Sequence, residues 1–133
     1  MVYFQKSQPA PNISRNYNIP EVLQSLKQDF KNKCYICEQK EATNINIEHF
    51  VAHQGDDSLK YDWNNLFLSC SHCNNIKLNN YNNLLNCTIS TDEVDIALHY
   101  YCKPMPKEYA VFNIKIPSNK ATQTKELLEK CFN

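Results

Sequence analysis

The pattern of apolar residues predicts a helix near the N-terminus of the chain. Apolar side chains recur there at the three- and four-residue spacing of one helical face, at Val22, Leu23, Leu26 and Phe30. Pro20 suits the first turn of such a helix, where its missing N–H group is not needed, and Asn18 lies near the predicted cap. We therefore predict a helix within residues 19–32, preceded by an irregular arm, residues 1–18.

Residues 33–79 show a different pattern, in which a strand and a short helix are separated by a polar loop. Polar and apolar residues alternate over 44–50, which is typical of a half-buried strand. Residues 53–62 are polar and contain the only glycine, so we expect a loop there. Beyond an apolar run, residues 70–77 predict the start of a short helix.

The last part of the chain predicts a β-hairpin and a helix. Residues 97–101 and 109–116 are rich in β-branched and aromatic side chains, and two prolines lie between them. Residues 121–132 form an amphipathic stretch with apolar side chains near its end. Residues 80–133 are therefore expected to hold this hairpin and helix beside the segment 33–79.

Length and composition indicate one small globular domain. The chain has 133 residues, of which 42% are hydrophobic and 21% charged. The elements above then predict an α+β fold, a single domain over residues 1–133. No leader or membrane-spanning stretch is recognised, so a cytoplasmic location is expected, where paired cysteines are more often metal ligands than disulfides.

Charge and glycine content exclude two function classes. The formal net charge of zero excludes a strongly basic nucleic-acid coat. The charge is uneven, since residues 1–40 hold six basic and three acidic groups and residues 41–66 hold one and five. The single glycine, Gly55, excludes the glycine-rich loops that hold nucleotide phosphates, so any ATP dependence would come from a partner.

Two Cys-x-x-Cys pairs are the strongest chemical signal in the sequence. Cys34 with Cys37, and Cys70 with Cys73, have the spacing of two zinc knuckles that together close a tetrahedral four-thiolate site. A closed site of this kind stabilises the fold but leaves no open position for catalysis. His72 could replace one cysteine, although four thiolates already fill the site. Three further cysteines lack partner spacing and are expected as buried core thiols, namely Cys87, Cys102 and Cys131.

The segment between the knuckles is longer than the roughly 15–20 residues of a simple zinc ribbon. Its polar residues follow a definite order: Glu48-His49-Phe50, Asn65-Leu66, and Cys70-x-x-Cys73-Asn74-x-x-Lys77. This order resembles the HNH, or ββα-metal, nuclease family, and it looks closest to the HNH subunits called PtuB in Septu and related retron-linked anti-phage systems. The match covers about Cys34 to Lys77. It implies a zinc-braced ββα-metal core within residues 33–79.

The resemblance also implies a role for each residue of the motif. His49 would be the general base, Glu48 and Asn74 would hold a catalytic Mg²⁺ or similar ion, and a structural zinc would occupy the four cysteines. Asn65 would orient the His49 ring or its loop, and Lys77 would contact a neighbouring phosphate. The resemblance further implies a nucleic-acid substrate, with DNA favoured over RNA, and a hetero-oligomer with an ABC-type (PtuA-like) ATPase subunit.

The chain departs from the family pattern at three places. The acidic residue is Glu48 where Asp is more general, the third motif position is Asn74 rather than His, and the proline that often follows Glu-His-Phe is absent. An amide oxygen is nevertheless a sound ligand for Mg²⁺. Whether His53 has a role at that place is open.

Several motif residues have structural alternatives. Asn64 is difficult to separate from Asn65 by sequence, and Asn74 could be a helix N-cap instead of a ligand. Tyr61 and Trp63 are expected in core packing. The acidic side chains of the polar loop are expected to be solvated, although they could bind a second ion; they are Asp56, Asp57 and Asp62.

Two other functions compete with an endonuclease. A non-catalytic zinc-ribbon module that binds nucleic acid or protein would account for the cysteines, but not for the ordered Glu48, His49 and Asn74. An interaction protein whose main task is to dock an ATPase would account for the apolar end of the chain.

Overall fold

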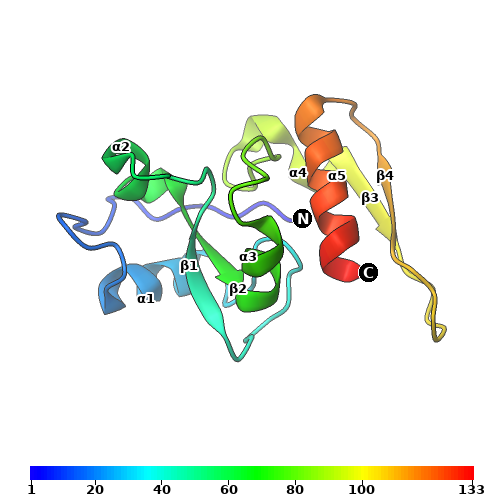
Figure 1. The fold of residues 1–133 in the computed structure, drawn as a ribbon, viewed down its shortest axis with the longest axis horizontal. Coiled ribbons are helices and arrows are strands. Elements are labelled where there is room, and N and C mark those ends of the chain that lie inside the picture. The colour runs from blue at the N-terminus through cyan, green and yellow to red at the C-terminus, as the bar shows by residue number, and fades with distance from the viewer.

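A computed structural model describes residues 1–133 (Figure 1). The helices and strands, in chain order, are α1 (Pro20–Asp29), β1 (Ile45–His49), α2 (Asp57–Lys60), β2 (Leu66–Cys70), α3 (Ser71–Lys77), α4 (Val94–Ala97), β3 (Leu98–Tyr101), β4 (Val111–Ile114) and α5 (Asn119–Phe132). Two short 3₁₀ turns lie at Trp63–Asn65 and Ser90–Asp92. The predicted α+β class is confirmed.

The centre of the fold is an antiparallel hairpin followed directly by a helix. β1 pairs with β2 from Ile45 opposite Cys70 to His49 opposite Leu66. Every residue of β2 is buried, because α1 packs on this strand from one side and α3 from the other (Figure 1). Cys70 caps α3, so the second knuckle joins the strand to the helix. This arrangement is the ββα core that the sequence predicted.

The N-terminal arm has neither helix nor strand, as predicted, but it is packed into the molecule. Phe4 is buried with its ring 4.9 Å from that of Phe30. The Lys6 ammonium lies 3.7 Å from the Trp63 ring centroid and donates to the Trp63 carbonyl at 2.7 Å. The Trp63 indole donates to the Ser7 carbonyl at 3.2 Å. Trp63 is thus a core residue, and the arm holds the turn before β2 in place.

The C-terminal hairpin and helix are also as predicted. β3 pairs with β4 in antiparallel register, and α5 packs against β4 and α3 (Figure 1). α5 begins after Ser118, whose hydroxyl accepts from the Ala121 N–H at 2.9 Å. Neither α2 nor α4 was predicted, since each is a single turn, too short to show a periodic pattern; α2 interrupts residues 53–62, which were expected to be a loop.

One expectation about the unpaired cysteines is wrong. Cys87 and Cys131 are buried, but Cys102 is exposed in the connection after β3. This connection extends away from the rest of the molecule (Figure 1), so nothing packs over it. No helix of the structure has both the length and the apolar character that crossing a bilayer requires.

Candidate active site and zinc site

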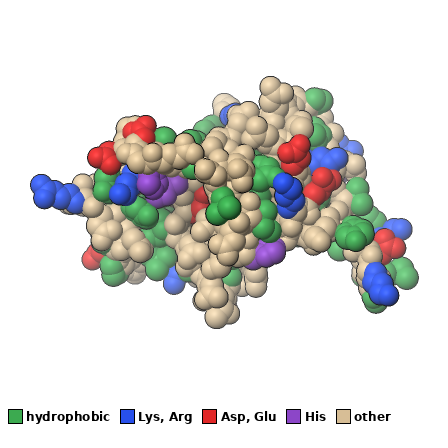
Figure 2. Space-filling model, viewed as in Figure 1, with side chains coloured by type: hydrophobic (Ala, Val, Ile, Leu, Met, Phe, Trp, Pro, Cys, Tyr) green, Lys and Arg blue, Asp and Glu red, His purple; other side chains and the backbone are tan.

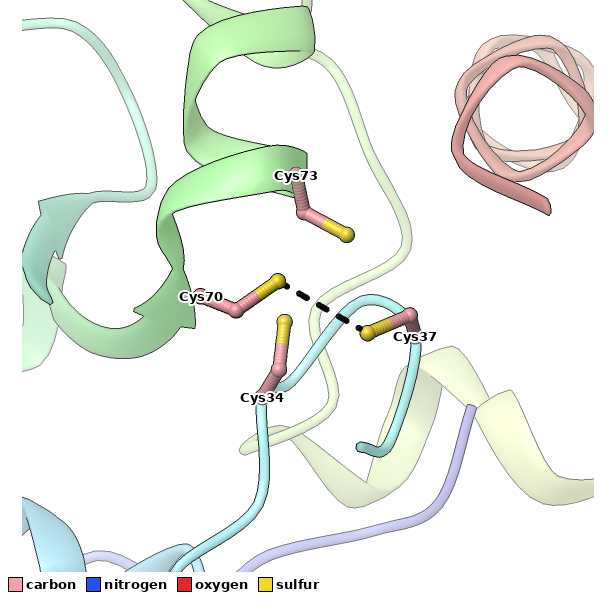
Figure 3. Close-up of side chains that lie close together, drawn as sticks. All are labelled: Cys34, Cys37, Cys70 and Cys73. Atoms are coloured by element: carbon pink, nitrogen blue, oxygen red, sulfur yellow. Dashed lines mark hydrogen bonds between the residues drawn. The ribbon is translucent and has the colours of Figure 1, made fainter. Parts of the chain in front are cut away.

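The four knuckle cysteines converge on one point. Their Sγ atoms all lie within 4.8 Å of one another, and those of Cys37 and Cys70 are 3.8 Å apart (Figure 3). A tetrahedron of sulfurs about 2.3 Å from a central zinc has edges of about 3.8 Å. All four thiols are free of disulfides. The cluster therefore fits one tetrahedral metal ion, and its donor set is that of a structural zinc.

Hydrogen bonds among these thiols favour the ionisation of Cys34 and oppose that of Cys37 and Cys73. Hydrogen bonds, first with Cys37 and then with Cys73, lower the pKa of Cys34, whereas its own bond to Cys34 raises the pKa of Cys37 to about 12. The pKa of Cys73 is raised, chiefly by its hydrogen bond with Cys131. Four thiolates at this separation need a central cation, which a divalent ion would provide.

His72 is not part of the cysteine cluster. Its Nε2 lies 2.9 Å from the Cys131 carbonyl, near the end of α5. A carbonyl only accepts, so this ring nitrogen carries a proton and donates. His72 thus ties α3 to α5, and it does not replace a cysteine.

Glu48 is more deeply buried than its neighbour His49. Glu48 is 5% exposed, and its two carboxylate oxygens accept from the Lys77 ammonium at 2.7 Å and from the Tyr35 hydroxyl at 2.9 Å. Burial raises the pKa of Glu48, and the Lys77 charge opposes this shift. Lys77 therefore neutralises the carboxylate within the protein.

Lys77 does not occupy the place expected of a phosphate ligand. Its side chain is fully buried, and its ammonium also donates to the His49 carbonyl at 3.0 Å. A side chain in this position cannot reach a bound phosphate, so the predicted contact does not fit. Lys77 instead joins the end of α3 to β1.

His49 lies at the end of β1 with a fixed ring orientation. Its Nε2 is 3.0 Å from the Lys60 carbonyl. Because the carbonyl only accepts, Nε2 carries the proton and Nδ1 of the neutral ring keeps its lone pair. Burial lowers the pKa of His49, which favours the neutral ring. The rings of Tyr17 and His53 pack edgewise on it at 4.7 and 4.6 Å.

Asn65 fixes the loop that holds the His49 ring. Its amide group accepts from the Val51 N–H at 2.8 Å and donates to the Val51 and Leu59 carbonyls at 2.9 and 3.1 Å. Leu59 precedes Lys60, whose carbonyl accepts from His49. Asn65 is buried and Asn64 is exposed, so Asn65 is the asparagine placed to orient this loop.

Asn74 lies inside α3 and does not cap it. The helix begins at Ser71, which makes Asn74 its fourth residue, so the alternative role as N-cap is wrong. No residue of the protein hydrogen-bonds to the Asn74 side chain, so its amide group is free.

Glu48, His49 and Asn74 share one open cleft of about 410 Å³, here called the histidine cleft. Its other lining residues are Tyr17, Ile47, Ala52, His53, Gln54, Leu78 and Asn79. A carboxylate and an amide facing one cleft are oxygen donors of the kind that Mg²⁺ takes. Asn74 has a free amide oxygen there, whereas both Glu48 oxygens already accept hydrogen bonds from Lys77 and Tyr35.

The acidic residues of the polar loop have local structural roles. Asp56 accepts from the Ser58 N–H at 2.9 Å and caps α2, and Asp62 accepts from the Asn64 N–H at 3.0 Å. Asp56, Asp57 and Asp62 do not line the histidine cleft. This arrangement fits the expected solvated loop rather than a second ion.

Sequence reasoning missed Tyr17 and Tyr35. Tyr17 belongs to the arm and has no motif around it, so no signal pointed to the cleft. Tyr35 lies between Cys34 and Cys37, where a buried hydroxyl could have been expected to need a partner.

The buried ion pair gives a stability prediction. Lys77→Met should lower the free energy of unfolding by about 3–5 kcal/mol, because it leaves the Glu48 carboxylate buried without its cation. Urea denaturation of the zinc-loaded protein measures this. The control is Lys125→Met, which removes an exposed pair with Glu129 and should change stability by less than about 1 kcal/mol. Equal effects of the two substitutions would contradict the prediction.

Comparison with known proteins agrees with this geometry. Residues 34–80 match the family model described as HNH endonuclease. Among curated proteins, the Septu protein PtuB of Bacillus thuringiensis is 29% identical over 89 residues, which cover 62% of this chain and 35% of PtuB. The chain thus spans about a third of the length of that relative. No solved structure matches the chain.

Proposed function

We propose, from the match of residues 34–80 to the HNH endonuclease family model, that the chain is a metal-dependent endonuclease that hydrolyses phosphodiester bonds. One observation carries the proposal. The His49 ring, held through Nε2, shares the histidine cleft with the oxygen donors Glu48 and Asn74. A fixed base beside a place for a divalent ion is what phosphodiester hydrolysis requires.

In the proposed reaction, His49 accepts a proton from water at Nδ1. The water oxygen then attacks phosphorus, the bond to the leaving sugar oxygen breaks, and that oxygen takes a proton from solvent. Asn65 holds the loop that keeps Lys60 against the ring, so Nδ1 is aimed without rearrangement. A divalent ion held by Glu48 and Asn74 would supply positive charge against the phosphate.

The zinc has a structural task in this proposal. The four cysteines join the turn after α1 to the junction of β2 and α3, which carries Asn74. A zinc bound there would fix the distance between Asn74 and the hairpin that carries Glu48 and His49.

We further propose a Septu-type anti-phage role, with an ABC-type ATPase as partner and DNA as the favoured substrate. The resemblance to PtuB supports this role. Charge supports a partner, because the chain is neutral and its Lys and Arg side chains are scattered over the face shown in Figure 2. Affinity for nucleic acid comes largely from clustered positive charge, so we expect weak binding by the chain alone.

A cleavage assay tests the proposal. The purified zinc-loaded chain, alone and with a co-expressed ATPase subunit, is incubated with plasmid, linear DNA and tRNA, with Mg²⁺ and without it. We expect Mg²⁺-dependent cleavage that increases with the partner. Binding without cleavage under every condition would instead support the zinc-ribbon module.

The His49 environment also predicts the pH dependence of cleavage. A general base works only when it is unprotonated, and burial lowers the pKa of His49 below its usual 6.5. We therefore expect kcat/KM to stay constant as the pH falls through neutrality and to drop only below 6.5. Rates measured from about pH 5 to about pH 9 check this. A decline centred above 7 would contradict it.

A further inference from the structure

His53 faces the same cleft as His49 with the opposite ring nitrogen bonded to the protein. Its Nδ1 lies 3.0 Å from the Gly55 N–H. A backbone N–H only donates, so Nδ1 accepts and is unprotonated, and the proton of the neutral ring is on Nε2. His49 has the reverse arrangement, with the proton on Nε2 bonded to Lys60 and the lone pair on Nδ1.

The two rings are close, and each keeps one nitrogen free. Their centroids are 4.6 Å apart at an interplanar angle of 66°. Neither His49 Nδ1 nor His53 Nε2 has a hydrogen-bond partner within the protein. The histidine cleft therefore offers one nitrogen acceptor and one N–H donor side by side.

The backbone around His53 is firmly held. Val51 is bonded at both its N–H and its carbonyl to Asn65, and the Ala52 N–H donates to the Asn82 side chain at 2.8 Å. The His53 carbonyl accepts from the Asp56 N–H at 2.7 Å. Gly55 has φ of +87°, which lets its N–H turn back to the His53 ring.

We propose that His53 is a second catalytic residue, whose Nε2–H donates a hydrogen bond to a non-bridging oxygen of the scissile phosphate. This inference rests on the proposed endonuclease function. The phosphate needs donors as negative charge builds on its oxygens, and the motif lysine, Lys77, is buried against Glu48. His53 supplies a donor at the cleft surface in its place.

Two substitutions of His53 distinguish the role of its Nε2–H donor from the role of its hydrogen bond with the Gly55 N–H. In His53→Asn, the side-chain oxygen can still accept from the Gly55 N–H, as asparagine does in turns, but the Nε2 donor is lost. In His53→Gln, an amide N–H lies near the position of Nε2. We expect His53→Asn to lower kcat roughly 10- to 100-fold, the effect of one hydrogen bond to a charged group. His53→Gln should retain most of the activity.

Zinc content and thermal stability are measured beside the kinetics. Both variants should have the zinc content and the unfolding temperature of the wild type. His53→Asn with the kcat of the wild type would overturn the proposal while leaving the endonuclease function intact. Equal losses in the two variants would also overturn it, because the amide N–H of glutamine would then fail to replace the Nε2–H donor. Absence of cleavage by the wild type with every substrate and partner would count against the endonuclease function itself.

A second measurement does not depend on turnover. Imidazole ¹⁵N–¹H spectra of the zinc-loaded protein should show His53 protonated at Nε2 and unprotonated at Nδ1. A DNA duplex added in the absence of Mg²⁺ should move the Nε2 proton downfield. The opposite tautomer, or a duplex that shifts His49 signals but not those of His53, would overturn the proposal.

Discussion

His49→Ala should lower cleavage roughly 100- to 10,000-fold, which is the usual contribution of a positioned general base. The ring is half-buried at the end of β1, and its only hydrogen bond is to the Lys60 carbonyl. Removing it should therefore delete the proposed base while leaving the hairpin register and the cysteine cluster intact. Initial rates on the best substrate of the cleavage assay measure the loss.

The matched control for this substitution is His99→Ala. His99 is exposed on β3, in the second sheet, and does not line the histidine cleft. We expect this variant to cleave at the rate of the wild type. If His49→Ala cleaves as well as His99→Ala does, His49 is not the base and the mechanism fails.

Loss of the metal from the cysteine cluster should unfold the protein. Zinc binding by such clusters is worth about 10–16 kcal/mol, which is comparable with the whole stability of a small domain, about 5–15 kcal/mol. Cys73→Ser removes one ligand from the buried cluster. We expect it to lose stoichiometric zinc and to lose the cooperative thermal transition, or to lower its midpoint strongly.

Cys102→Ser is the control for this experiment, because Cys102 is exposed and remote from the four-cysteine cluster. It should bind one zinc per chain and unfold at the temperature of the wild type. Metal analysis measures the zinc bound per chain in the two variants, and calorimetry measures their unfolding temperatures. A cooperative transition in Cys73→Ser at the wild-type temperature would show that the cluster does not hold the fold.

Local spacing and alternation predicted the parts of the site that lie close in sequence. Cys-x-x-Cys pairs make knuckles by their own geometry, and the Tyr35 N–H bond to the Leu68 carbonyl then brings the first knuckle beside β2. The period-two pattern of 44–50 predicted that Glu48 and His49 lie at the end of a strand.

Contacts between distant segments could not be predicted in this way. Lys77 resembles an exposed helical lysine, and only the packing of α3 on β1 brings it to Glu48. Tyr17 reaches His49 because Phe4 and Lys6 anchor the arm, and no periodic pattern encodes that anchoring. Cys102 is exposed because the connection between β3 and β4 extends away from the rest of the molecule. The alternation of polar and apolar residues does not predict how far such a connection extends.

The internal pairing of Glu48 with Lys77 makes folding independent of the proposed catalytic ion. A buried carboxylate without a partner is costly, but here an ammonium already balances its charge. In the proposed mechanism, the chain would therefore remain folded while the divalent ion exchanges, provided that the cysteine cluster keeps its own ion. Withdrawal of Mg²⁺ would then stop cleavage without lowering the temperature of unfolding.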